Sequence, residues 1–119
     1  MARAIAFFPK QVFMGTTAAA VAHVSEIFEI TEEGRIDFEC RVYALYSAVT
    51  ITGSLETTSD PTFLDASWKQ LAGSSFLRSS SGITVQTGIS GLGRFVRAKI
   101  EVPTSGIVCA RLDAVARAL

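Results

Sequence analysis

The stretch from residue 35 to residue 45, RIDFECRVYAL, alternates strictly between two kinds of side chain. One set is Ile36, Phe38, Cys40, Val42 and Ala44, and the other is Arg35, Asp37, Glu39, Arg41 and Tyr43. Successive side chains of an extended strand point to opposite faces, whereas a helix would scatter these residues around its circumference. The alternation therefore predicts a strand with one buried face and one solvated face.

The same alternation predicts strands at 48–57, 82–88, 94–102 and 106–116, with a short one at 75–79. Their expected inward residues are Val49, Ile51, Leu55, Ile83, Val85, Val96, Ala98, Ile100, Val102, Val108, Ala110, Leu112 and Ala114. Gly53 lies on an inner face, which indicates a bulge or a close backbone approach. The sequence TEEGR, with Gly34, predicts a hairpin turn between Ile30 and Ile36.

Two segments leave the choice between helix and strand open. The run 18–30 is rich in alanine, which favours helix, but Val24, Phe28 and Ile30 alternate with polar neighbours. The tail 111–119, RLDAVARAL, fits the alternation of a strand and also the spacing of a short helix.

About eight short strands, separated by turn signals and not alternating with helices, are typical of an all-β sandwich. The chain has 119 residues, the size of one domain. We therefore predict a single-domain sandwich of about eight antiparallel strands with jelly-roll-like connections. Residues 1–17 are expected to form an N-terminal arm or edge strand, and residues 18–119 the sandwich.

The charge and hydrophobicity of the chain limit the kinds of partner that it is expected to bind. Eleven basic and eleven acidic residues give no net charge, which argues against nucleic-acid binding. Hydrophobic residues make up 49% and charged residues only 18%, so apolar surface should remain exposed and favour an oligomer. The apolar run at residues 4–8 is short for a signal peptide, and no run approaches a membrane span. We therefore expect an intracellular product without membrane contact.

No catalytic, cofactor-binding or metal-binding constellation is found in the sequence. His23 is the only histidine and has no neighbouring partner for a triad or a metal site. The glycine-rich run 88–94, GISGLGR, links two strands and does not open a helix, so it does not predict a phosphate site. Cys40 and Cys109 are expected on opposite kinds of face and unpaired. These features predict a protein that is not an enzyme, and they disfavour a cupin-like enzyme in particular.

Trp68, the only tryptophan, has two interpretations. In the structural one, it closes one end of the core and keeps its indole N–H near the rim. In the functional one, its ring stacks on a sugar while Asp60 or Asp65 hydrogen-bonds the hydroxyls. The two aspartates alone are too few oxygen ligands for calcium.

Two outward rows combine aromatic residues with arginine, a combination that protein interfaces enrich. One row contains Arg35, Arg41 and Tyr43, and the other contains Phe95, Arg97 and Lys99. If the rows lie close together they form a candidate contact surface, and otherwise they are ordinary solvated sheet faces.

The run 49–73, VTITGSLETTSDPTFLDASWKQLAG, followed by GRFVRAKIEV and a closing strand, resembles small all-β virion proteins of tailed bacteriophages, including head decoration (cement) proteins. The resemblance covers roughly residues 48–116. The residues that carry it are Glu56, Ser59, Asp60, Trp68, Phe95, Val96 and Arg97.

The resemblance implies a structural protein of the virion, made in the host cytoplasm, that binds where capsomers meet. Such a protein is expected to associate with itself, as a trimer, and with the major capsid protein. Phe7, Phe8 and Phe13 in the N-terminal segment are candidate anchors on a neighbouring subunit. The alternative is a carbohydrate-binding sandwich that uses Trp68.

Overall fold

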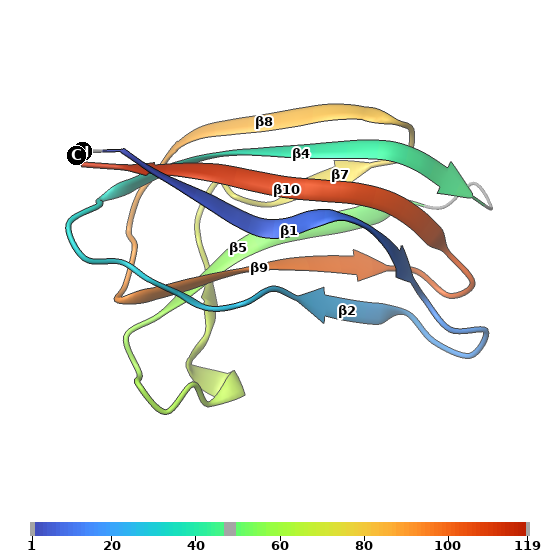
Figure 1. The fold of residues 1–119 in the computed structure, drawn as a ribbon. Helices are drawn as coiled ribbons and strands as arrows, with labels where there is room; N and C mark the ends of the chain where they lie inside the picture. Colours follow the sequence, from blue (N-terminus) through green and yellow to red (C-terminus); the bar gives the residue numbers. More distant parts are fainter. Residues whose placement is uncertain (1, 47–49, 119) are drawn as a thin grey trace.

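The computed structural model describes residues 2–46 and 50–118, and these form two antiparallel sheets (Figure 1). The first sheet has the strand order β1-β10-β4-β8 and the second β2-β9-β5-β6, with β3 also paired to β9 and β7 to β5. The strands are β1 (Arg3–Met14), β2 (Val21–Val24), β3 (Phe28–Glu29), β4 (Arg35–Tyr46), β5 (Ile51–Thr58), β6 (Lys69–Gln70), β7 (Phe76–Arg78), β8 (Gly82–Ile89), β9 (Phe95–Val102) and β10 (Ile107–Arg117). A turn of 3₁₀ helix spans Asp65–Ser67.

This order is that of a jelly roll. Strands β2 and β3 lie along β9, and β6 and β7 lie along β5, so each pair fills one strand position. The eight positions then run 1-8-3-6 in the first sheet and 2-7-4-5 in the second. Two such sheets joined by Greek-key links define the jelly-roll sandwich, and the predicted fold class is confirmed.

The core lies between the two sheets. The inner faces contribute fully buried side chains from β4, β5, β9 and β10, among them Ile36, Phe38, Cys40, Ile51, Leu55, Ile100 and Leu112. These are the alternate residues expected from the sequence, because a sheet buried on one face places every second side chain inside. Val49 lies outside the described residues.

Both ambiguous segments contain strands, and neither forms a helix in its described residues. The alanine-rich run contains the short strands β2 and β3, and the C-terminal tail continues β10 to Arg117. In β10, Leu112 lies between Phe8 of β1 and Cys40 of β4. Strand pairing on both sides therefore decides the conformation of this tail. Among the described residues, no helix has the length and apolar character needed to cross a membrane.

The prediction that Ala44 faces the core is wrong. The register between β4 and β10 shifts by one residue at Tyr43, so Ala44 is opposite Cys109 on the outer face. Leu45 takes the inward position opposite Val108 and packs on the core. A β-bulge of this kind exchanges the two faces of the strand beyond it.

The inward placement of Ile83 and Val85 is also wrong. Their exposed fractions are 46% and 59%, and Thr84 between them faces inward. Strand β8 pairs with β4 so that Thr84 is opposite Cys40, whose side chain is in the core. Directly opposed residues share a face, so the register overrides the apolar pattern of β8.

The segment 30–34 is not a hairpin turn. Strand β3 belongs to the second sheet and β4 to the first, so this segment crosses between the layers. Gly34 donates its N–H to the carbonyl of Arg117, 2.9 Å away, which ties the crossing to the end of β10.

Residues 3–14 form an edge strand, and they do not extend away from the body as an arm. Strand β1 pairs with β10 along its length, and Arg3 at its start lies opposite Ala116 near the end of β10 (Figure 1). Phe7, Phe8 and Phe13 are 2%, 5% and 2% exposed, so they are core residues and not free anchors. The aromatic side chains are buried because the bulges around Phe8 turn them between the sheets.

Candidate functional site

Three aromatic side chains form a second apolar cluster on the outer face of the second sheet. Phe63 stacks on Trp68 at a centroid distance of 6.2 Å, and it meets Phe95 edge-on at 4.8 Å. Phe95 comes from β9, and the other two come from the connection between β5 and β6. Trp68 therefore does not close one end of the main core, which lies on the other side of this sheet.

Local hydrogen bonds shape the connection that carries Phe63. The Asp60 carboxylate accepts hydrogen bonds from the hydroxyl and the backbone N–H of Thr62, at 2.7 and 2.9 Å, as in an Asx turn. These bonds hold the pKa of Asp60 below its usual range, with the hydroxyl bond as the largest cause. Phe63 follows with a φ of 55°, in the left-handed region that side chains rarely adopt. The turn thus directs the Phe63 ring back onto the sheet.

The other end of this connection is also fixed. Ser67 donates its hydroxyl to the carbonyl of Leu64 at 2.7 Å, and Thr58 donates to the Ser67 hydroxyl at 3.0 Å. Thr58 is the last residue of β5, so the 3₁₀ turn is attached directly to the sheet. These bonds place Trp68 over β9.

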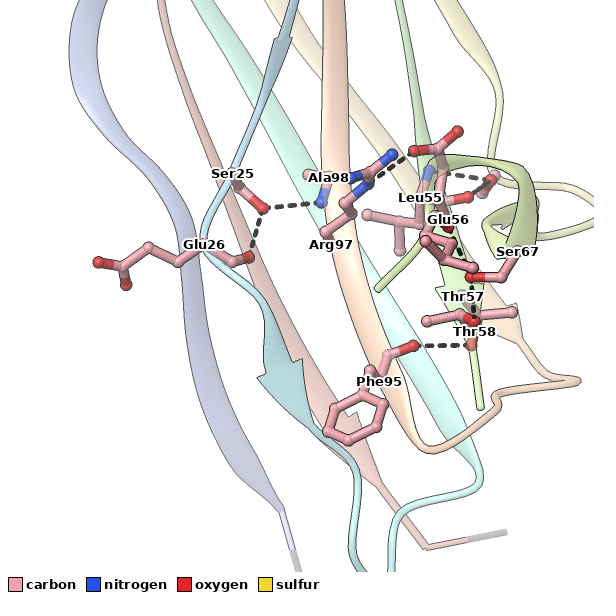
Figure 2. A network of polar contacts seen from close by, with 12 residues as sticks. Ser25, Glu26, Leu55, Glu56, Thr57, Thr58, Ser67, Phe95, Arg97 and Ala98 are labelled. Atoms are coloured by element: carbon pink, nitrogen blue, oxygen red, sulfur yellow. Dashed lines mark hydrogen bonds and ion pairs between the residues drawn. The ribbon is translucent and has the colours of Figure 1, made fainter. Parts of the chain in front are cut away.

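An ion pair between β9 and β5 lies beside the cluster. Figure 2 shows Arg97 of β9 reaching Glu56 of β5, with Nε and Oε1 2.9 Å apart. The side chains are only 15% and 14% exposed. The Arg97 guanidinium carbon also lies 4.3 Å from the centre of the Trp68 ring, in cation–π contact. Arg97 therefore joins the ion pair to the aromatic cluster.

This arrangement leaves little of the Trp68 ring for a ligand. Trp68 is 8% exposed, and its buried indole N–H has no hydrogen-bond partner within the described residues. Phe63 is 37% exposed and Leu64 63%, so they form the surface of the cluster. Asp60 and Asp65 lie in the exposed turn, and the described part of the chain contains no group of three or more possible metal ligands.

The two rows of the expected contact surface do not meet. Arg41 and Tyr43 lie on the outer face of the first sheet, whereas Phe95 and Arg97 lie on the outer face of the second. The core separates them, so they cannot form one surface. Tyr43 instead lies under Lys10 of β1, whose Nζ is 4.4 Å from the ring centre.

The centre of the first sheet's outer face is a charged, solvated surface. Arg111 contacts Glu39 at 3.7 Å and Asp113 at 3.2 Å, and Arg117 contacts Asp37 at 3.1 Å. The pairs with Glu39 and Asp37 join β10 to β4, and the pair with Asp113 lies within β10. They leave the apolar side chains of β8, at the margin, as a separate strip.

The strip on β8 is a candidate surface that the sequence did not indicate. Ile83 and Val85 were expected inside, because alternating β-branched residues in a strand normally face a core. A useful signal was the composition of the strand, since Gly82–Ile89 contains no charged residue. The strand position at the edge of the sheet follows only from the topology.

The comparisons define the class of the fold. No family model matches the chain, and no curated protein matches it in sequence. A chain in the structure of infectious bursal disease virus Gx strain is similar, with a TM-score of 0.59 and 8% identity. The match covers 98% of this chain and 33% of that chain, so this chain spans about a third of its length.

Two other solved structures match along nearly their whole length. YomS, a protein derived from the SPBc2 prophage, has a TM-score of 0.57 and 10% identity, with 98% of this chain and 92% of that chain covered. The C-terminal CBM6 domain of LamC, from Zobellia galactanivorans, has a TM-score of 0.52 and 10% identity, with 98% and 100% covered. At these identities the likeness is one of fold, and it places the chain among jelly-roll sandwiches.

Proposed function

We propose that the chain is a non-enzymatic structural protein of a virus particle, which binds the coat at capsomer junctions and stabilises it. The observation that carries this proposal is the uncharged edge strand β8, with Ile83 and Val85 exposed on a small protein of zero net charge. An exposed apolar strip on a β-sheet edge favours association with other protein chains. The fold supports the proposal, since the similar structures include a virus and a prophage-derived protein.

The proposed partners are other copies of the chain and the major capsid protein. A small sandwich that contacts two or more coat subunits at once gains residence time, because each contact raises the effective concentration of the next. Burial of surface between coat subunits supplies the binding free energy, and no cofactor is needed. The trimer expected from the resemblance stays a prediction.

Co-sedimentation with particles tests this proposal. Particles from the source of the chain are banded in a density gradient, and the chain is detected with a specific antibody. We expect the chain to band with the coat protein and to resist a low-salt wash. Detection only in the particle-free fractions would contradict the proposal.

Carbohydrate binding is the second candidate, and one observation favours it. Phe63 is partly exposed above Trp68, beside the exposed residues Leu64 and Asp65, and the similar folds include a CBM6 domain. The buried Trp68 ring weakens this candidate, because stacking on a sugar needs an open aromatic face. Titration with laminari- and xylo-oligosaccharides, followed by Trp68 fluorescence, distinguishes the two: saturable quenching supports carbohydrate binding, and an unchanged spectrum supports the structural role.

A further inference from the structure

The four sheet edges of the molecule differ in how they are protected against pairing with another chain. An edge strand presents unpaired N–H and C=O groups, and natural proteins block such edges with proline, charge, bulges or interruptions. Strand β1 contains Pro9 and Lys10 and has two register shifts along β10. That edge of the first sheet is therefore poorly suited to accept a further strand.

Both edges of the second sheet are interrupted, and serine side chains fill the gaps. Between β2 and β3, the Ser25 hydroxyl accepts the N–H of Ala98 at 2.8 Å (Figure 2). Between β6 and β7, the buried Ser74 hydroxyl bonds the N–H of Leu55 at 3.1 Å. The strands at these edges are two to four residues long, too short for an extended ladder with another chain.

Strand β8, at the other edge of the first sheet, has none of these protections over its first five residues. Residues 82–86 pair with β4 in one constant register, and the register shift comes only after Gln86. At that point Gly88 has a φ of 69° and donates its N–H to Asp37 at 2.7 Å. The stretch 82–86 contains neither proline nor a charged residue, and Figure 1 shows β8 at the margin of its sheet with no strand beyond it.

We propose that the β8 edge pairs antiparallel with the β8 edge of a second copy, which joins the two first sheets into one continuous sheet. The second copy fits because an antiparallel edge is complementary to itself across a two-fold axis. The absence of net charge on the chain removes a general repulsion between copies. No opposing charges need to be matched along the stretch 82–86.

The alternation of faces restricts the register of this pair. In the stretch 82–86 the even-numbered residues face inward and the odd-numbered residues face outward. Opposed residues must share a face, so an even-numbered residue pairs with an even-numbered one and an odd-numbered residue with an odd-numbered one. The regular stretch 82–86 is centred on Thr84, and an axis through Thr84 uses its full length. Ile83 then lies opposite Val85 of the partner subunit, and Val85 opposite the partner's Ile83. Four exposed apolar side chains thus form one strip, and cross-strand pairs of β-branched residues stabilise antiparallel sheets.

Light scattering after size exclusion tests the pairing with two matched valines. Val85 on β8 and Val12 on β1 are both 59% exposed, and both point outward from edge strands of the same sheet. We expect the wild type to contain pairs of chains and Val85→Lys to halve that mass, because two lysines would enter the strip. Val12→Lys should leave the mass unchanged. A wild type that is monomeric at every concentration, or equal behaviour of the two variants, would overturn the proposal.

Hydrogen exchange gives a second readout that does not depend on a variant. Amides of residues 82–86 should exchange more slowly at high protein concentration and faster on dilution, while β10 stays protected throughout. A trimer whose β8 amides exchange at the same rate at all concentrations would also overturn the pairing. The inference builds on the proposed structural role, but the two can be refuted separately. If the pairing of β8 edges is refuted while the chain still bands with particles, the structural role remains supported.

Discussion

Arg97 lies over the ring of Trp68 at 4.3 Å and at the same time pairs with Glu56 at 2.9 Å. One side chain thus links the strand pair β5–β9 to the connection that covers it. We predict that Arg97→Ala shifts Trp68 emission to longer wavelength and lowers the free energy of unfolding by about 2 kcal/mol, since it loses the cation–π contact and leaves Glu56 unpaired in a partly buried place. Urea unfolding followed by fluorescence measures both effects.

Arg111→Ala is the matched control for this prediction. Arg111 of β10 also pairs with a carboxylate on a neighbouring strand, Glu39 of β4, but its side chain is 36% exposed. Exposed ion pairs contribute about 0–1 kcal/mol, so the control should lose less stability and keep the emission of the wild type. Equal losses in the two variants, with unchanged emission, would show that Arg97 does not hold the cluster.

Gly53 faces the ring of Phe76 inside the core, and a Cβ at position 53 would overlap that ring. The sequence predicted a close approach at this glycine, and the neighbour is a side chain and not a backbone. We predict that Gly53→Ala lowers the free energy of unfolding by about 1–3 kcal/mol through overpacking. In the double variant with Phe76→Leu the added methyl group should cost less than it does in the wild type. Strictly additive losses in a double-mutant cycle would contradict the contact.

Phe13 and Val12 are neighbours in β1 with opposite environments, 2% and 59% exposed. We predict that Phe13→Ala lowers the free energy of unfolding by about 3–5 kcal/mol, because it opens a cavity where Phe8 and His23 meet the ring. Val12→Ala should change it by less than about 0.5 kcal/mol. Deletion of residues 2–13 is accordingly expected to unfold the chain. A Phe13→Ala variant as stable as the wild type would restore the picture of a free arm.

The alternation of residues 35–42 was sufficient to predict β4 and its two faces, because burial on one face leaves a period of two in the sequence. The jelly-roll class followed from the number and spacing of such segments. The exchange of Ala44 and Leu45 was not predictable in the same way, because the bulge at Tyr43 depends on the register with β10. The reversed faces of β8 likewise result from pairing with β4, over forty residues away in sequence.

The aromatic cluster could be predicted only in part. The sequence placed Phe95 and Arg97 on an outward row, and the structure has this feature. The contact between Phe63 and Phe95 requires the connection to fold back over the sheet, and it does so because Phe63 has a left-handed backbone conformation. A phenylalanine in the sequence does not predict that conformation. The burial of Trp68 under Phe63 and Arg97 therefore depends on tertiary contacts and could not be predicted from the local sequence.

The two cysteines should differ sharply in reactivity. Cys40 is fully buried on the inner face of β4, while Cys109 is partly exposed on the outer face of β10. Burial raises the pKa of the Cys40 thiol from 9.0 to about 12, because the thiolate would lose its hydration. A thiol reagent should thus label one site per native chain, Cys109, and two after unfolding. Rapid labelling of native Cys40 would contradict its burial.

The raised pKa of Cys40 also predicts a dependence of stability on pH. Above pH 9.0 the unfolded chain loses the thiol proton while the folded chain keeps it, up to about pH 12. The stabilisation from the neutral thiol is complete below pH 9.0, and it is lost as the pH rises through this window. The free energy of unfolding should therefore fall more steeply with pH in the wild type than in Cys40→Ala. Parallel pH profiles of the two proteins would contradict the shift.

The proposed role is tested most directly by the stability of particles with and without the chain. Particles assembled without the chain are divided into two samples, and the purified protein is added to one of them. Both samples are heated, and a fluorescent dye reports the release of their nucleic acid. We predict that addition raises the temperature of release in a saturable way, with the oligosaccharides tested above having no effect on it. A release temperature that does not change at any amount of added protein would contradict the stabilising role.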